Sequence, residues 1–262
     1  MSRISFDRKK CMQCLRCISV CPFTVLHEKN GRPEVTPGKA CILCAHCAAA
    51  CPADAVLLDG TSGVLAEDLP AFPGEFPQNL GNFLKIRRSY RHFKPVPVEE
   101  ETLEGALQAA AWAPSAKNQH PARWYAVHGE EKIQEIMGHI LAYVKETGVN
   151  PEIVVEYENG NNVVTGTART LLLVFAEEAS LNPAVDTALA LYTAELFLQS
   201  RGVGTCWAGY LTRMCNQVPA LQRLFALPDG HRFYGALMAG YPENETYLHI
   251  PRRLNMPEVR TL

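Results

Sequence analysis

The sequence predicts two domains, a small cysteine-rich domain followed by a larger domain of the α/β or α+β class. Three observations support this prediction. Eight of the ten cysteines lie between residues 11 and 51. Residues 61–82 contain several prolines and glycines without a sustained hydrophobic period, which is typical of a linker. From residue 83 onward, helical and strand-like hydrophobic patterns are interspersed. We therefore expect domains at residues 1–60 and 83–262, joined by residues 61–82.

The overall composition is that of an ordinary globular protein. Of the 262 residues, 47% are hydrophobic and 20% are charged, so the chain can bury a core. The formal charge of -2 argues against nucleic acid as a partner. No apolar run approaches the roughly 20 residues of a membrane helix, and no signal-peptide pattern is present. We expect a cytoplasmic protein whose clustered cysteines bind metal rather than form disulfides.

The first domain contains the same cysteine run twice, and each run reads C-x-x-C-x-x-C-x-x-x-C-P. The eight cysteines are Cys11, Cys14, Cys17, Cys21, Cys41, Cys44, Cys47 and Cys51. This run is typical of two-cluster ferredoxins, in which four soft thiolates hold each [4Fe–4S] cluster. A zinc site is the alternative, but zinc usually takes one tetrahedral set with a longer gap between two C-x-x-C pairs. The repeat therefore indicates two [4Fe–4S] clusters.

The spacing also predicts how the cysteines are shared. The first three sulfurs of each run converge on one cluster, and the fourth, ahead of a proline, points to the other. We expect one cluster on Cys11, Cys14, Cys17 and Cys51, and the second on Cys21, Cys41, Cys44 and Cys47. We also expect each half to contribute a short strand pair and a short helix after its Cys-Pro.

Hydrophobic periods predict the elements of the second domain. We expect helices over residues 101–113, 133–144 and 186–200, and strands over residues 124–128, 171–176 and 233–239. The first helix has acidic residues in its first turn and ends at Pro114. The run 171–176 is apolar throughout, as in a strand buried on both faces. The helix 186–200 is apolar nearly all round, which predicts a place in the core or at a subunit interface.

Four further segments of the second domain carry possible ligand-binding chemistry. Residues 87–93 read Arg-Arg-Ser-Tyr-Arg-His-Phe, and these cations and a hydroxyl could hold a phosphate and a flavin edge or be a solvated basic face. Residues 113–121 form a loop of small and amide residues after a helix. Residues 202–209 are glycine-rich, so the backbone can approach a planar ligand closely. Residues 251–253 place two arginines near the C-terminus.

Taken in this order, the four segments resemble the nitroreductase family of FMN-dependent oxidoreductases, over about residues 83–262. The whole chain looks like a ferredoxin–nitroreductase fusion. The resemblance implies an α+β sandwich and a homodimer whose interlocked subunits form two FMN sites. The residues that it implies for FMN binding are Arg87, Arg88, Ser89, Arg91, Pro114, Ser115, Ala116, Asn118, Cys206, Trp207, Ala208, Gly209, Arg252 and Arg253.

The resemblance also implies a role for each group of these residues. The arginines and Ser89 would meet the phosphate, ribityl chain and pyrimidine edge. Residues 114–118 would come from the other subunit and lie along the isoalloxazine. Residues 206–209 would line the ring, with a backbone N–H near N5. One departure is His120, which stands where the family often has glutamine; it could line the substrate entrance and titrate near neutral pH, or be an ordinary loop histidine. We read Cys215 as a small buried hydrophobe.

These features predict an iron–sulfur flavoprotein oxidoreductase. Electrons would enter at the clusters and pass to FMN, which would reduce a small organic acceptor such as a nitro compound or a quinone. No side-chain acid or nucleophile is required. In a first alternative, NAD(P)H reduces FMN and electrons leave through the clusters, although no G-x-G-x-x-G fingerprint is present. In a second, the chain is an electron-transfer module without its own substrate, with residues 143–168 covering the flavin face. An external redox protein is a further possible partner.

Overall fold

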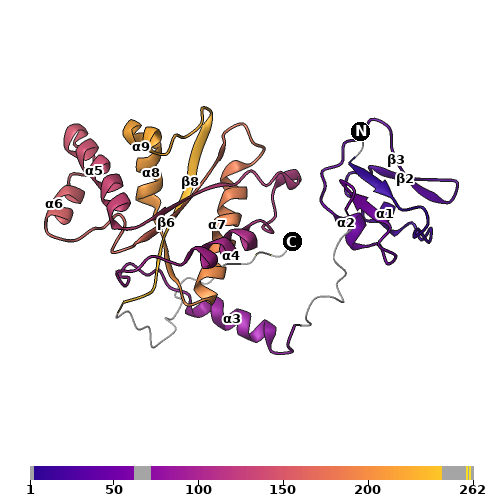
Figure 1. Cartoon of the computed structure of the whole chain (residues 1–262), viewed down its shortest axis with the longest axis horizontal. Coiled ribbons are helices and arrows are strands. Elements are labelled where there is room, and N and C mark those ends of the chain that lie inside the picture. The colour runs from indigo at the N-terminus through magenta and orange to yellow at the C-terminus, as the bar shows by residue number, and fades with distance from the viewer. Residues whose placement is uncertain (1–2, 62–71, 244–257, 259, 261–262) are drawn as a thin grey trace. The chain divides into compact units, whose positions relative to one another are not determined.

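The structure, a computed structural model, describes residues 3–61, 72–243, 258 and 260. The chain divides into two compact units (Figure 1). The first comprises Met1–Gly74 together with Lys117–Gln119, and the second comprises Glu75–Ala116 and His120–Leu262. The division after residue 74 falls inside the stretch that we expected to be a linker. Each unit is described by itself below.

The first unit contains two small antiparallel sheets and two single-turn helices. Strand β1 (Ile4–Phe6) pairs with β4 (Val56–Leu58), and β2 (Leu26–Lys29) pairs with β3 (Arg32–Val35). The helices are α1 (Arg16–Ser19) and α2 (His46–Ala49). The buried core of this unit includes Ile4, Cys17, Leu26, Cys47 and Val56. The β1–β4 pair joins the beginning and the end of the unit, so each sequence half does not supply a strand pair of its own.

The helices of this unit correct a second expectation. Both precede the Cys-Pro step of their half, whereas we placed them after it. The three-residue spacer between the third and fourth cysteines is long enough for one helical turn. The proline that follows the fourth cysteine lacks an N–H and cannot continue the helix, so the turn must end before it.

The second unit is built on a four-stranded sheet with the strand order β5-β6-β8-β7. Every neighbouring pair is antiparallel, which makes the unit α+β rather than α/β. The strands are β5 (Arg123–His128), β6 (Thr170–Glu177), β7 (Gly204–Trp207) and β8 (His231–Gly240). The helices are α3 (Phe76–Ile86), α4 (Glu100–Ala110), α5 (Glu130–Thr147), α6 (Glu152–Glu158), α7 (Pro183–Ser200), α8 (Gly209–Gln217) and α9 (Pro219–Leu224).

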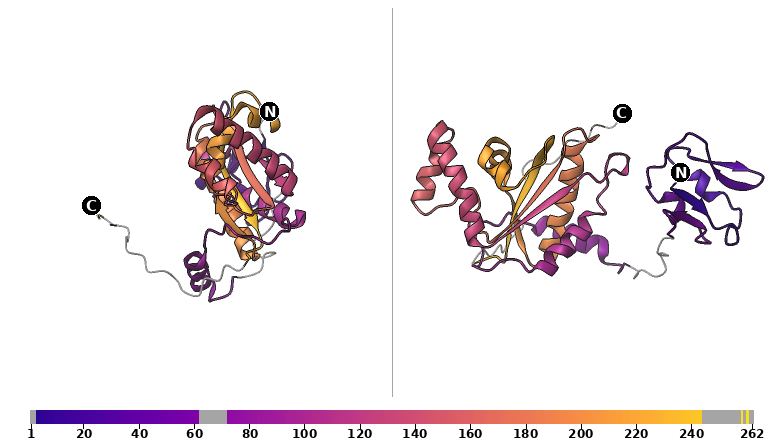
Figure 2. Two further views of the ribbon diagram at one scale, coloured as in Figure 1. Left: turned by 90° about the vertical axis from the view of Figure 1, so that its left-hand side faces the viewer. Right: turned by 45° about the horizontal axis from the view of Figure 1, so that its top comes forward.

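Helices cover both faces of this sheet, as Figure 2 shows. Strand β6 alternates between two cores because successive side chains of a strand point to opposite faces. Leu171, Leu173 and Phe175 pack in the core that α5, α8 and α9 share. Leu172 and Val174 pack in the other core, against α4 and α7. The apolar run of β6 is therefore buried on both sides, as its composition predicts.

Strand β7 and helix α3 were not predicted from the sequence. The glycine-containing segment 204–207 forms β7, because it pairs with the edge of β8. Helix α3 begins at Phe76, inside the range expected as a linker, and has Pro77 in its first turn, where a missing N–H costs nothing. Every residue of α3 in the described structure is at least partly exposed. No helix in the described ranges is both long and apolar enough to cross a membrane.

Candidate functional site

The first unit contains two cavities, each lined by four cysteines. One is lined by Cys11, Cys14, Cys17 and Cys51 together with apolar neighbours such as Phe6 and Val56. The other is lined by Cys21, Cys41, Cys44 and Cys47 together with Ile4, Phe23 and Leu58. Each cavity thus takes three cysteines from one half of the sequence and its fourth from the other half. These are the two sets that the spacing predicts.

The backbone around the two cavities repeats almost residue by residue. Gln13 and Leu15 have φ values of 59° and 59°, and their counterparts Leu43 and Ala45 have 54° and 61°. This left-handed conformation is unusual for non-glycine residues and turns the chain sharply between the first three cysteines. In the same way, the N–H of Val25 lies 3.3 Å from Cys21 Sγ, and that of Ala55 lies 3.2 Å from Cys51 Sγ. The internal repeat of the sequence is therefore also a repeat of conformation.

The chemistry of both cavities fits a [4Fe–4S] cluster. Four sulfurs surround an apolar space, whereas in the described part of the chain no three His, Cys, Asp or Glu side chains converge as ligands of one metal ion. In a cubane each thiolate binds a different iron, so its ligands are spread out. Burial raises the pKa of the Cys47 thiol to about 11, so this group must release a proton when it binds iron.

The second unit has a buried carboxylate at the centre of a polar network. The side chain of Glu195, on α7, is 1% exposed. Its Oε1 lies 3.2 Å from Nη1 of Arg87, and its Oε2 accepts a hydrogen bond of 2.7 Å from the Trp207 indole. Thr205 Oγ1 donates to Oε1 at 3.2 Å and accepts from Gln199 at 2.6 Å. Glu195 therefore connects the arginine-rich segment to the end of β7.

The same two segments also meet through their backbones. Ser89 forms a parallel bridge with Thr205, and the N–H of Tyr90 donates to the Thr205 carbonyl at 2.9 Å. The contact requires glycine at position 204, because a Cβ there would lie 2.8 Å from a ring carbon of Tyr90. The structure thus brings together two of the four segments from the sequence analysis, residues 87–91 and 204–209.

The loop after α4 is fixed at a different place on α7. The N–H of Ala116 donates to Oδ1 of Asp186 at 2.9 Å, and the N–H of His120 donates to Ser115 Oγ at 2.9 Å. Asp186 and Glu195 are nine residues apart, which is about 13 Å along a helix. Within one chain, this loop is therefore anchored far from the Glu195 network.

Five other residues that were predicted to bind FMN lie at separate places in the second unit. The side chain of Cys206 lies in the core that contains α5 and α8, so it faces away from Trp207, which is 40% exposed. The N–H of Ala208 donates to the Ala236 carbonyl at 2.8 Å, whereas Gly209 begins α8, where an α-helix leaves N–H groups without intrahelical partners. Arg88 Nη1 donates to the carbonyls of Lys85 and Arg87 at 2.7 Å. Pro114 is exposed and opens the loop.

Three further residues were predicted to bind FMN. Arg252 and Arg253 lie outside the described residues. Asn118 falls in the first unit with the segment Lys117–Gln119.

Cys215 is fully buried and burial raises its pKa to about 12, which agrees with its interpretation as a small hydrophobe.

Sequence reasoning missed Glu195 and Asp186. A signal for both was present, because they are the only two charged residues between positions 186 and 200, in a helix that is otherwise nearly all apolar. A charge in such a helix is rarely buried unless it is paired. Asp186 is 4% exposed and Glu195 is 1% exposed, so both needed partners from other segments.

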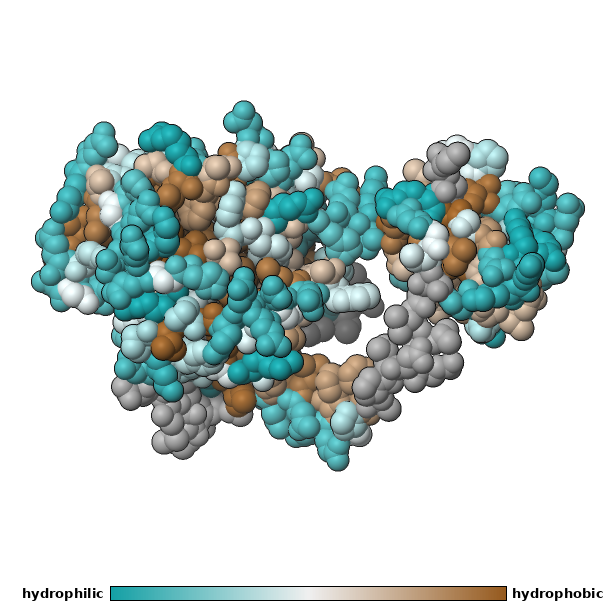
Figure 3. Space-filling model, in the orientation of Figure 1, coloured by the Kyte–Doolittle hydropathy of each residue, from teal (hydrophilic) through white to brown (hydrophobic). Residues whose placement is uncertain are grey.

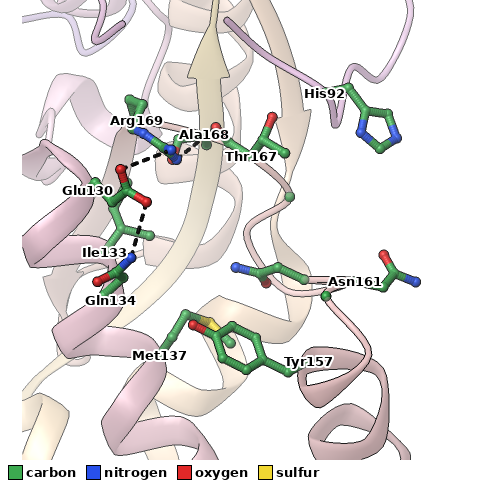
Figure 4. A pocket seen from close by; sticks show the side chains of 13 residues that line it. His92, Glu130, Ile133, Gln134, Met137, Tyr157, Asn161, Thr167, Ala168 and Arg169 are labelled. Carbon is green, nitrogen blue, oxygen red and sulfur yellow. Dashed lines mark hydrogen bonds and ion pairs between the residues drawn. The ribbon is translucent and has the colours of Figure 1, made fainter. Parts of the chain in front are cut away.

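A cavity of about 460 Å³ with a mixed polar and apolar lining adjoins the arginine-rich segment. Figure 4 shows the ion-paired Glu130 and Arg169 on one side of it and His92 and Asn161 on the other. The loop along one side of it is braced by Gly166, whose φ is 56° and where a Cβ would come within 2.2 Å of the Arg91 carbonyl oxygen. Only glycine allows this close approach. The cavity is thus held beside residues 91–93.

Comparison with known proteins gives a match for each unit. The nitroreductase family model matches residues 84–241, and a model described as a 4Fe-4S dicluster domain matches residues 10–56. Among curated proteins, "Putative NAD(P)H nitroreductase YfhC" of Bacillus subtilis is 25% identical over 169 residues, which cover 63% of this chain and 84% of that protein. The 5,6-dimethylbenzimidazole synthase of Rhodospirillum rubrum is 26% identical over 190 residues, which cover 67% of this chain and 88% of that protein.

The solved structures agree in fold. A nitroreductase with bound FMN from Bacteroides fragilis has a TM-score of 0.60 at 22% identity, and the match covers 70% of this chain and 98% of that one. Together with the geometry above, these matches define an oxidoreductase of the nitroreductase type that carries an iron–sulfur domain. The chain belongs to the nitroreductase family. The α+β sandwich and the ferredoxin–nitroreductase fusion that the resemblance implied are confirmed.

Proposed function

We propose that the protein is a reductase that takes up single electrons at two [4Fe–4S] clusters and transfers electron pairs from bound FMN to a small organic acceptor. Nitro compounds and quinones are the acceptor classes that we propose. The observation that carries this proposal is the presence of two four-cysteine cavities in the same chain as a nitroreductase domain. Clusters supply one-electron transfer, and a flavin supplies the conversion to two-electron chemistry. The fusion therefore acts as a built-in electron supply for the flavin.

The described residues suggest how FMN would be held. Arg87, Arg88, Ser89 and Arg91 would bind its phosphate, ribityl chain and pyrimidine edge, with Arg252 and Arg253 completing the phosphate site. Trp207 and the N–H of Gly209 would face the ring. Glu195 fixes Arg87 and Trp207 relative to each other, which is a reason to assign both to one site. Ser115 and the neighbouring loop residues, including Pro114, Ala116 and Asn118, would come from a second copy of the chain.

The cavity beside His92 favours an enzyme over an electron-transfer module. Residues 143–168 were expected to cover the flavin face in such a module. Instead Tyr157, Asn161 and Gly166 line an open cavity of about 460 Å³ next to the segment assigned to FMN. The amide side chains in its mixed lining, such as Asn161 and Asn162, offer hydrogen bonds to an acceptor with oxygen atoms, such as a nitro or carbonyl group.

We propose that the protein is a homodimer, because two helices expose apolar faces. On α7, Val185, Leu189 and Tyr192 are 50%, 39% and 39% exposed, and their spacing puts them on one face. On α3, Phe76, Leu80 and Leu84 recur every four residues and are also exposed. Figure 3 shows apolar residues along one side of α3 and polar ones along the other. Such faces are typical of a subunit interface.

The dimer can be tested by substitution at the centre of the α7 face. Light scattering should give about twice the chain mass of 29.0 kDa for the unchanged protein. Leu189→Glu should shift the protein toward monomers and lower its FMN content, because a charge would be buried at the interface. Val149→Glu, at a residue that is 42% exposed on another surface, is the matched control and should remain dimeric. A monomeric unchanged protein would contradict the proposal.

One finding favours the reverse direction of electron flow as a second candidate. A relative bears the name of an NAD(P)H nitroreductase, so a nicotinamide could also reduce the flavin of this protein. In that case the clusters would carry electrons away. The dimethylbenzimidazole synthase among the relatives shows that family membership alone does not fix the reaction.

The direction of flow is tested by anaerobic spectroscopy of the full chain with its clusters and FMN. Reduced low-potential ferredoxin is expected to reduce the clusters and then the flavin, and added nitroaromatic or quinone should reoxidise both. NADH and NADPH should reduce the flavin slowly or not at all. Rapid flavin reduction by NAD(P)H followed by cluster reduction would support the second candidate instead. Absence of bound flavin after reconstitution with FMN would overturn both.

A further inference from the structure

The two cysteine runs share their cysteines and the following proline but differ at the residues between them. Between the second and third cysteines, the first half has Leu15-Arg16 and the second has Ala45-His46. Arg16 and His46 both begin the single-turn helix of their half. His46 Nδ1 lies 3.1 Å from the Sγ of Cys44, which is hydrogen-bonding distance. In the described structure, no corresponding side-chain contact to a sulfur is recorded in the first half.

The backbone adds to this difference. Each cavity receives one matched N–H···S contact, from Val25 to Cys21 and from Ala55 to Cys51. The second cavity receives a further one, because the N–H of Leu43 lies 3.3 Å from Cys41 Sγ. Among the described residues, the Cys21, Cys41, Cys44 and Cys47 cavity therefore has two contacts to its sulfurs, from the N–H of Leu43 and from Nδ1 of His46, that have no equivalent at Cys11 and Cys14.

Hydrogen bonds to cluster sulfurs raise the reduction potential of a cluster. Reduction adds negative charge that spreads onto the sulfurs, so an N–H donor stabilises the reduced form more than the oxidised form. An iron-bound thiolate has no proton and can only accept, so the Nδ1 of His46 must carry the proton of this contact. With iron bound to Cys44, His46 would thus donate to one cluster, and among the described residues its counterpart Arg16 makes no such contact.

We propose that His46 sets the cluster held by Cys21, Cys41, Cys44 and Cys47 at a higher potential than its partner cluster, so that the first electron to enter the unit resides there. This inference rests on the cluster assignment of the proposed function. His46 is a positioning and tuning residue in this role, since it contacts a ligand thiolate. It gives two otherwise repeated sites different tasks within one electron path.

The test is a redox titration at fixed pH, monitored by electron paramagnetic resonance, on the full chain with its clusters and FMN. His46→Phe keeps an aromatic ring but removes the donor. It should lower the equilibrium constant for reduction of the higher-potential cluster about three- to tenfold. This change corresponds to a reduction potential that is lower by about 30–60 mV for a one-electron couple. His46→Asn, whose amide can donate from a similar place, should keep the potential of this cluster close to that of the unchanged protein. Arg16→Phe, the matched control, should leave that potential unchanged.

The outcomes separate this inference from the proposed function. The unchanged protein should contain about eight iron atoms per chain, four in each cluster. A lower iron content or a zinc-loaded protein would overturn the cluster assignment itself. Full iron content with equal potentials in the unchanged protein and in His46→Phe would overturn only the role of His46. A His46→Asn variant that behaves like His46→Phe would also overturn it, because hydrogen bonding would then not be the cause.

Discussion

The double variant Cys11→Ala/Cys51→Ala is expected to retain about four iron atoms per chain, whereas Cys11→Ala/Cys21→Ala should retain almost none. The reason is the crossed lining of the two cavities. Cys11 and Cys51 line the same cavity, so their joint loss destroys one cluster and spares the other. Cys11 and Cys21 belong to one sequence run but line different cavities, so their joint loss damages both clusters. Iron analysis and visible absorption of anaerobically reconstituted protein provide the measurement.

The comparison carries its own control, because both variants lose two cysteines. If each run held its own cluster, the two results would be exchanged, and the Cys11→Ala/Cys21→Ala protein would keep half of its iron. FMN content should stay near one per chain in both variants, since the second unit is compact by itself. Loss of FMN from both would show instead that the substitutions disturb the whole chain.

The second large effect is expected at Glu195. Glu195→Ala should lower the free energy of unfolding of the second unit by about 3 kcal/mol, because it leaves a partly buried guanidinium without its counter-charge. This loss is at the low end of the range for broken buried ion pairs, because the Arg87 side chain is 25% exposed. The Trp207 indole and the Thr205 hydroxyl also lose their acceptor. Since native proteins are stable by only about 5–15 kcal/mol, this loss is substantial.

The measurement is urea unfolding followed by tryptophan fluorescence. All three tryptophans, Trp112, Trp124 and Trp207, lie in the second unit, so the signal reports that unit. Glu158→Ala is the control, because its ion pair with Lys145 is exposed and such pairs contribute about 0–1 kcal/mol. Glu195→Gln keeps the shape and one acceptor oxygen and should have an intermediate effect. Equal midpoints for Glu195→Ala and Glu158→Ala would refute a central role for the buried carboxylate.

The iron–sulfur cavities were the part of the structure best predicted from sequence. Their ligands lie within 41 residues, and short spacers leave few ways to arrange four sulfurs. The predicted position of the two helices was wrong because the proline after the fourth cysteine ends a helix rather than begins one. The pairing of β1 with β4 could not be foreseen, because it joins strands more than 50 residues apart that have no local signal.

In the second unit, long periodic elements were predicted well and short or polar ones were not. The buried β6 strand and the α7 helix have strong apolar patterns. Strand β7 has only four residues, one of which is glycine, so its pairing with β8 outweighs its own low strand propensity. The Glu195 network joins residues 87, 195 and 207, and only the packing of α7 against the end of β7 brings them together. The FMN residues taken from the resemblance stay predictions.

The crossed lining of the cavities has a consequence for how the protein is made. The cavity of Cys11, Cys14 and Cys17 acquires its fourth cysteine only when residue 51 has been synthesised. Until then, a nascent chain presents three thiols at one site and a single thiol, Cys21, for a site that does not yet exist. Neither cluster can therefore be completed on the first repeat alone. On the proposed assignment, iron can complete either site only after the second repeat has been synthesised.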